Sequence, residues 1–204
     1  MAKFYVVWKG RKTGIFTTWE RCSAQVKGFT DAEYKAFPSR EMAERAFRGH
    51  YREYAGRPAS SQQWLFASHP PVIESCCVDA ACSGSPGPLE YRGVATATGK
   101  TLFSCGPYRN GTNNVGEFLA IVHALTLLKD SGLPIPVYSD SETAIAWVRA
   151  GNCNTDLRRE ASNAPLFELI AGAEAWLALN MKHNPVLKWD TAAWGEIPAD
   201  FNRK

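Results

Sequence analysis

The pattern of apolar and polar positions predicts a small β-β-α-β-α unit at the start of the chain. Runs rich in strand-forming residues at 3–8, 15–18 and 34–37 predict three strands, and residues 19–26 have helical character. Ser39 suits the N-cap of a second helix that reaches to about Tyr54, because acidic residues come early in it and basic residues late. A unit of this size can bury only a marginal core.

A different composition follows at residues 55–71, where Gly, Pro, Ser and Gln dominate. The apolar triplet Trp64-Leu65-Phe66 interrupts this stretch and is a candidate for docking on a neighbouring domain. We therefore assign residues 1–54 to a first domain, 55–71 to a linker and 72–204 to a second domain.

The second domain has the pattern of an α/β fold. Strands are predicted at 72–81, 91–98 and 102–108, and their short connections indicate an antiparallel meander. A helix at 112–130 follows, with apolar residues at helical spacing: Val115, Phe118, Leu119, Val122, Leu125 and Leu128. Further elements are a strand at 135–139, helices at 142–150 and 165–179, a strand at 186–189 and a short helix at 198–203. The order β-β-β-α-β-α-α-β-α predicts a five-stranded mixed sheet covered by helices.

Charge and cysteine content bear on the partner and the cellular compartment expected for the protein. Residues 1–58 carry 12 Lys and Arg residues against 6 Asp and Glu, a bias that suits a polyanionic partner and that chance alone also produces. No run of about 18 apolar residues predicts a membrane span. The six cysteines form no C-x-x-C pair and no secretory signal is recognisable, so we expect reduced thiols and a cytoplasmic protein.

Three carboxylates lie at positions where α/β proteins commonly have their functional sites. Asp79 lies within an apolar strand, Asp140 follows a strand and precedes a helix, and Glu117 lies in the first turns of the helix at 112–130. Bound divalent cations would relieve the repulsion within such a cluster, and oxygen ligands favour Mg²⁺ or Mn²⁺. Each residue also has a structural interpretation: Asp79 as the partner of a backbone group, Glu117 as a dipole-favoured residue and Asp140 as an N-cap.

Four segments carry a resemblance to a known family. The motif Val-Asp-Ala-Ala-Cys at 78–82, the motif Thr-Asn-Asn-Val-Gly-Glu-Phe at 112–118 and the motif Tyr-Ser-Asp-Ser-Glu at 138–142 resemble the successive catalytic motifs of type 1 ribonucleases H. Residues 188–204 resemble the closing motif of a bacterial branch of that family. The resemblance implies an endoribonuclease that cuts the RNA strand of RNA–DNA hybrids with two Mg²⁺ ions, or Mn²⁺, and leaves 5′-phosphate and 3′-hydroxyl ends.

The resemblance also assigns the metal ligands, which are Asp79, Glu117, Asp140 and Asp200, with Asp79 bridging both ions. Glu196 matches a fifth carboxylate linked to metal exchange and product release. Many members carry a histidine in this loop, whereas residues 190–199 contain none, so we expect Glu196 to take over part of that role. Asp190 lies at a position where the family does not require an acid.

Contacts to the nucleic acid follow from the same resemblance. The 2′-hydroxyls of the RNA would meet Glu117, the turn around Cys82 and residues Ser83, Gly84, Ser85, Asn113 and Glu142. The family often has Asn and Gln at the positions of Ser85 and Glu142. The DNA strand would meet Thr112, Asn114, Thr155 and Trp147, although Trp147 suits helix–sheet packing equally well.

Residues 4–37 resemble the hybrid-binding domain of many ribonucleases H1, a module related to part of a viral translation transactivator, viroplasmin. In that module the positions of Trp19 and Tyr34 pack on the DNA backbone, and those of Tyr5 and Lys35 assist, with Lys12 among the neighbouring cations. The basic residue usual at the position of Ala36 is missing. Read without the resemblance, aromatic residues in so small a unit also suit its core.

Three other functions deserve comparison with a monomeric hybrid nuclease. A catalytically silent hybrid-binding protein or a structural module would not need all four metal carboxylates. Another nuclease of the same fold, such as a transposase or a Holliday-junction resolvase, would not need the hybrid-binding segment or so close a match at 112–118. The sequence therefore favours a ribonuclease H.

Overall fold

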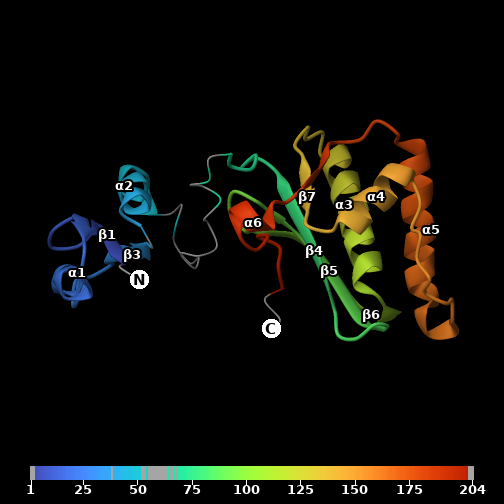
Figure 1. Ribbon diagram of the computed structural model, residues 1–204, viewed down its shortest axis with the longest axis horizontal. Coiled ribbons are helices and arrows are strands. Elements are labelled where there is room, and N and C mark those ends of the chain that lie inside the picture. The colour runs from blue at the N-terminus through green and yellow to red at the C-terminus, as the bar shows by residue number, and fades with distance from the viewer. Residues whose placement is uncertain are drawn as a thin grey trace. The chain divides into compact units, whose positions relative to one another are not determined.

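The computed structural model describes residues 3–37, 39–51, 54, 64, 67 and 69–201. The chain divides into two compact units, Met1–Ser68 and His69–Lys204 (Figure 1). Of the triplet at 64–66, Trp64 is buried, whereas Leu65 and Phe66 lie outside the described residues, as does most of the stretch assigned to a linker.

The first unit contains a three-stranded antiparallel sheet in the order β2-β1-β3. Its elements are β1 (Phe4–Lys9), β2 (Gly14–Phe16), α1 (Trp19–Val26), β3 (Glu33–Phe37) and α2 (Arg40–Arg48), which confirms the predicted β-β-α-β-α order. Helix α2 ends at Arg48 and not near Tyr54. The indole N–H of Trp8 donates to the carbonyl oxygens of Ala46 and Gly49, and these bonds satisfy carbonyls that a longer helix would use.

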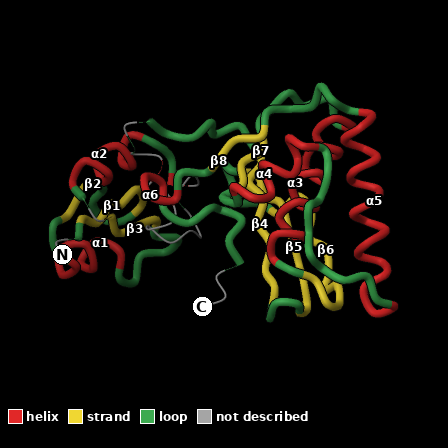
Figure 2. Tube along the Cα trace, turned by 45° about the vertical axis from the view of Figure 1, so that its right-hand side comes forward, coloured by secondary structure: helices red, strands yellow, loops and turns green. Residues whose placement is uncertain are grey.

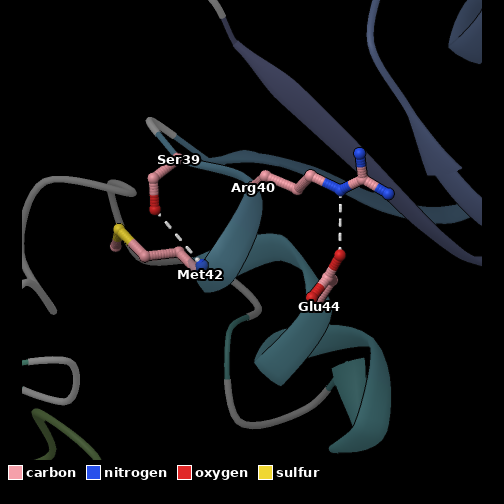
Figure 3. A network of polar contacts seen from close by, with 4 residues as sticks. All are labelled: Ser39, Arg40, Met42 and Glu44. Carbon is pink, nitrogen blue, oxygen red and sulfur yellow. Dashed lines mark hydrogen bonds and ion pairs between the residues drawn. The ribbon is translucent and has the colours of Figure 1, made fainter.

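Both helices of this unit begin at a hydroxyl cap. The Thr18 hydroxyl accepts from the Arg21 N–H, and the predicted N-cap Ser39 accepts from the Met42 N–H at 3.2 Å (Figure 3). The exposed pair between Arg40 Nε and Glu44 Oε1, 2.9 Å apart, lies one turn along α2 and adds little stability beside the cap, which is worth about 1 kcal/mol.

Adjacent residues of β1 point to opposite faces of the small sheet and so divide its core in two. Val6 packs with residues of α2 and with Phe37 and Tyr54, whereas Val7 packs with Cys22 and Val26 of α1. Each face therefore has its own helix.

The second unit contains a mixed sheet in the order β6-β5-β4-β7-β8. Strands β4 (Cys76–Cys82), β5 (Gly87–Ala95) and β6 (Thr101–Gly111) are antiparallel, and β7 (Val137–Ser139) and β8 (Val186–Lys188) continue the sheet in parallel. Its helices are α3 (Asn113–Asp130), α4 (Glu142–Ala150), α5 (Ala164–Leu179) and α6 (Thr191–Trp194). In both views α3, α4 and α5 lie together on one side of the sheet, with α3 against the strands (Figures 1 and 2). This topology confirms the predicted α/β class.

Helix α3 forms the centre of the main core. All six of the apolar positions that set its helical spacing are buried, with exposures of 4% or less. The helix is covered by the sheet, α4 and α5, so its buried surface extends well beyond one stripe. Among the described residues, no helix is long and apolar enough to cross a membrane.

Several predicted boundaries are wrong. Strand β5 spans Gly87–Ala95 and not 91–98, and β6 reaches Gly111 and not 108. Two further errors have identifiable reasons. The first strand starts at Cys76 and not at Val72, because the Val72 N–H donates to the Tyr138 hydroxyl instead of to a strand. The helix predicted at 198–203 is absent over 198–201, and residues 202–204 lie outside the described part. In its place Asp190 caps the short helix α6, and the carbonyl oxygens at 199 and 200 accept from Arg92.

Candidate active site

Three of the predicted metal ligands come together at the centre of the sheet. Asp79 lies in β4, Asp140 directly follows the parallel strand β7, and the β4–β7 register Cys77↔Tyr138, continued by two residues, brings these carboxylates level. Glu117 reaches them from the first turns of α3. One carboxylate oxygen from each of the three residues lies within 4.8 Å of the other two.

A glycine lets α3 approach the sheet closely enough for this contact. A Cβ atom at Gly116 would lie 2.7 Å from the Ala80 Cβ and 2.5 Å from the Leu89 Cδ1. Both distances are shorter than real carbon contacts, so any side chain at 116 would push the start of α3 away from β4 and β5. Because Glu117 is the next residue, the glycine sets the distance between Glu117 and Asp79.

Polar neighbours orient the carboxylates. The buried Ser139 hydroxyl donates to Glu117 Oε2 at 3.3 Å and accepts from the Ser141 N–H at 3.1 Å, and the Asn113 amide donates to Glu117 Oε1 at 3.4 Å. The Phe201 N–H donates to Asp79 Oδ2 at 3.2 Å. The cluster therefore receives donors from α3, from β7 and from the end of the chain.

Burial makes this cluster hold protons more tightly than ordinary carboxylates. Desolvation, followed by the charges of Asp140 and Asp200, raises the pKa of Asp79 to about 6, although its hydrogen bond with Glu117 acts in the opposite direction. Desolvation and the charges of Asp79 and Asp140 raise the pKa of Glu117 well above its ordinary value. The pKa of Asp140 is raised mainly by burial, with Lys188 opposing. Such shifts indicate that a cation is the natural partner of this cluster.

Of the two remaining predicted carboxylates, Asp200 lines the same cleft. Asp200 and Phe201 line a cleft of about 610 Å³ together with Asp79, Glu117 and Asp140. Glu196 is exposed, and its charge adds to the raised pKa of Asp140. Asp190 instead accepts from the Ala193 N–H and caps α6.

Most of the predicted nucleic-acid contacts of this unit line one of two clefts, whereas Gly84 and Glu142 line neither. Ser83 and Asn113 line the carboxylate cleft, and a second cleft of about 580 Å³ is lined by five of the others: Ser85, Thr112, Asn114, Trp147 and Thr155. Trp147 also meets Phe118 edge-on at 6.3 Å, so it both packs against α3 and faces the cleft. Gly84 has a φ of 120°, which favours glycine, and Glu142 lies exposed in the first turn of α4.

Sequence reasoning missed several residues of these clefts. Arg158 lines the second cleft, Ser139 and Gly116 shape the carboxylate cluster, and Arg92 contacts the segment that carries Asp200. The Ser-Asp motif at 139–140 is a signal for Ser139, but nothing in the sequence connects Arg92 with a segment more than 100 residues away.

In the first unit, the predicted aromatic residues form a continuous row. The ring centroids of Tyr5 and Trp19 are 5.6 Å apart and those of Trp19 and Tyr34 are 5.8 Å apart, and Trp19 and Tyr34 are 45% and 40% exposed. Lys12 is exposed. Lys35 points to the other face of β3, where its ammonium group donates to the Tyr54 carbonyl oxygen.

Comparison with known proteins is consistent with this arrangement. Residues 3–47 match the family model of the ribonuclease H1 N-terminal domain. A ribonuclease H of Crithidia fasciculata is 49% identical over 64% of this chain, which spans only 38% of that relative's length. A ribonuclease H of Ehrlichia ruminantium is 32% identical over 59% of this chain and 78% of the relative. A crystal structure of a ribonuclease H1 from Halobacterium salinarum is 20% identical over 58% of this chain and 86% of that one, with a TM-score of 0.37, too low to support an argument.

By fold and site, the second unit is an α/β domain with a buried carboxylate cluster in a cleft. The Ehrlichia relative and the N-terminal match identify the family: the chain belongs to the ribonuclease H family and carries a domain of the ribonuclease H1 N-terminal type. The resemblance predicted from its motifs is thereby confirmed.

Proposed function

We propose that this protein hydrolyses the RNA strand of RNA–DNA hybrids with two divalent cations, Mg²⁺ by preference and Mn²⁺ as a substitute. The observation that carries the proposal is the cluster of Asp79, Glu117 and Asp140, whose oxygens lie within 4.8 Å of one another at the bottom of an open cleft. A purely structural domain would gain nothing from burying three acids together.

The residues present fit a pair of hard divalent cations. All the candidate ligands are carboxylate oxygens, the donors that Mg²⁺ prefers, and two of them are more than 90% buried. Asp79, Glu117, Asp140 and Asp200, which line one cleft, would hold the ions. When bound, the ions would lower the pKa of the attacking water and neutralise charge on the scissile phosphate and the leaving 3′ oxygen.

The protein's own groups would orient this chemistry. Ser139 and Asn113 hold the Glu117 carboxylate from two sides, and the Phe201 N–H holds Asp79, so neither side chain has to reorganise. Glu196, an exposed acid whose charge acts on Asp140, would exchange ligands with solvent as the 5′-phosphate product leaves.

Selectivity for RNA would arise at the rim of the carboxylate cleft. Ser83 and Asn113 border this cleft beside Glu117, where a 2′-hydroxyl next to the scissile phosphate would find both donors and acceptors. The neighbouring second cleft, with Thr112, Asn114 and Thr155, would hold the DNA strand by its phosphates.

The N-terminal unit would bind the same hybrid through its aromatic row. Trp19 and Tyr34 offer exposed rings for sugars next to the half-buried Tyr5, and Lys12 adds an exposed cation to the same unit. Tethering would raise the effective concentration of hybrid at the catalytic unit. Since one chain supplies all the carboxylates, we propose that a monomer is active.

The decisive test compares cleavage of a labelled RNA–DNA hybrid with that of duplex RNA and duplex DNA, in Mg²⁺ and in Mn²⁺. The wild type should cut only the RNA strand of the hybrid, Asp79→Asn should abolish cutting, and Asp130→Asn, an exposed acid at the end of α3, should preserve it. Hybrid binding without cleavage in either metal would refute the enzyme and leave a binding protein.

A further inference from the structure

The segment that carries Asp200 differs from the other ligand-bearing elements. Asp79 is fixed by a strand, Glu117 by a helix and Asp140 by the end of a strand, whereas residues 199–201 belong to neither helix nor strand. Within the segment, the Asp200 N–H donates to the Ile197 carbonyl oxygen at 2.9 Å and closes a turn. Contacts from other elements can therefore help to hold Asp200 in the cleft.

Arg92 of β5 provides such a support. Its Nε donates to the Ala199 carbonyl oxygen at 2.7 Å and its Nη2 to the Asp200 carbonyl oxygen at 2.5 Å. Its guanidinium carbon also lies 4.5 Å from the centroid of the Phe201 ring. One side chain thus contacts three successive residues.

The position of Arg92 in the sheet links this support to the metal cluster. Arg92 is the direct cross-strand partner of Asp79 in the β4–β5 register, so both side chains project from the same face. The segment that Arg92 holds returns a hydrogen bond to Asp79 through the Phe201 N–H. Arg92, residues 199–201 and Asp79 therefore form a closed chain of contacts.

The chemistry of arginine suits this task better than that of lysine. A guanidinium is planar and permanently charged, and its parallel N–H groups can serve two adjacent carbonyl oxygens while its face stacks on a ring. A lysine ammonium could reach one carbonyl oxygen but could not reproduce the fork and the stacking together.

We propose that Arg92 is a positioning residue that holds Asp200 where it can bind a divalent cation together with Asp79. The inference rests on the proposed function of the carboxylate cleft. Loss of Arg92 would free the Asp200 segment, and cation affinity would fall before affinity for the hybrid does. Partners that orient metal ligands in this way typically contribute about 10–100-fold to metal affinity or activity.

The test uses the full chain with Arg92→Met, Arg92→Lys and a matched control, Arg149→Met, which removes an exposed arginine from the last turn of α4. Two quantities are measured: Mn²⁺ binding to the hybrid-free protein by electron paramagnetic resonance, and the Mg²⁺ concentration that gives half-maximal cleavage. We expect Arg92→Met to raise both the Kd for Mn²⁺ and the half-maximal Mg²⁺ concentration by about tenfold or more. Arg92→Lys should recover part of that loss, and the control should match wild type. The KM for hybrid at saturating Mg²⁺ should stay unchanged.

Circular dichroism melting checks that each variant is folded, and Arg92→Lys carries the test if Arg92→Met melts too low. Unchanged metal constants in a folded Arg92 variant would overturn the inference, as would a change confined to the KM for hybrid. If the wild type binds Mn²⁺ but cuts no hybrid, the proposed function fails, and the Mn²⁺ titrations still decide the role of Arg92.

Discussion

Replacing Asp79 by Asn should stabilise the metal-free protein while abolishing its activity. The pKa of Asp79 rises from an ordinary 3.8 to about 6 in the folded state, chiefly because the side chain is only 8% exposed. A raised carboxyl pKa means that the folded state binds the proton more tightly, so stability falls as pH rises from about 4 to about 6. The difference corresponds to about 3 kcal/mol at pH 7. Asn keeps the shape and an oxygen that accepts from the Phe201 N–H.

The assay is urea unfolding of wild type and Asp79→Asn in EDTA at pH 4.5 and at pH 7.5, with Asp130→Asn as the control for loss of an exposed negative charge. We expect the variant to be more stable by up to about 3 kcal/mol at pH 7.5 and by much less at pH 4.5. In a parallel series without EDTA, Mn²⁺ should stabilise the wild type and not the variant, because a ligand stabilises only a folded state that binds it and the variant lacks the Asp79 carboxylate. Equal or lower stability of the variant at pH 7.5 would refute the desolvation argument.

Three further predictions test other parts of the structure. The methyl group of Gly116→Ala would lie 2.7 Å from the Ala80 Cβ, so this variant should lose about 1–3 kcal/mol of stability in urea unfolding and have a lower kcat. A wild-type kcat would show that α3 need not approach the sheet so closely. Trp194→Phe removes the indole N–H that donates to the His69 carbonyl oxygen at 2.8 Å and should cost about 1 kcal/mol of stability with kcat unchanged; a fall in kcat at equal stability would contradict this. Trp19→Ala should weaken hybrid binding, measured by fluorescence anisotropy, by about 1–3 kcal/mol and leave kcat at saturating hybrid unchanged. Unaltered affinity for the hybrid would exclude the aromatic row as a binding surface.

The carboxylate cluster was predictable because each ligand follows a local rule. An acid inside an apolar strand, an acid directly after a strand and an acid at the start of an apolar helix can all be recognised without coordinates, as Asp79, Asp140 and Glu117 show. The order of elements was equally accessible, since the periodic apolar positions of α3 and the turn residues between β4, β5 and β6 are strong local signals. Assigning these acids roles in one reaction required the family resemblance.

The sequence failed where a distant partner decides the local conformation. Pro198 is a reasonable start for a helix, but Arg92, far away in the chain, takes the carbonyl oxygens at 199 and 200. Helix α2 similarly stops where the indole of Trp8 reaches its last carbonyls. Lys35 follows Tyr34 directly, yet strand alternation turns it to the opposite face. Short-range patterns contain no information about the contacts of Arg92 and Trp8, whereas the alternation of a strand at 34–37 already separates Lys35 from Tyr34.

The same distant contacts explain how a self-repelling cluster stays in place. Buried like charges would drive Asp79, Glu117 and Asp140 apart or force them to remain protonated. The fold opposes this with close packing at Gly116, with the Ser139 and Asn113 donors, and with the terminal segment that Arg92 holds. These supports come from separate elements, so loss of one should weaken cation binding without unfolding the sheet. The cluster is thus held ready for cations by the rest of the fold, at the expense of stability in their absence.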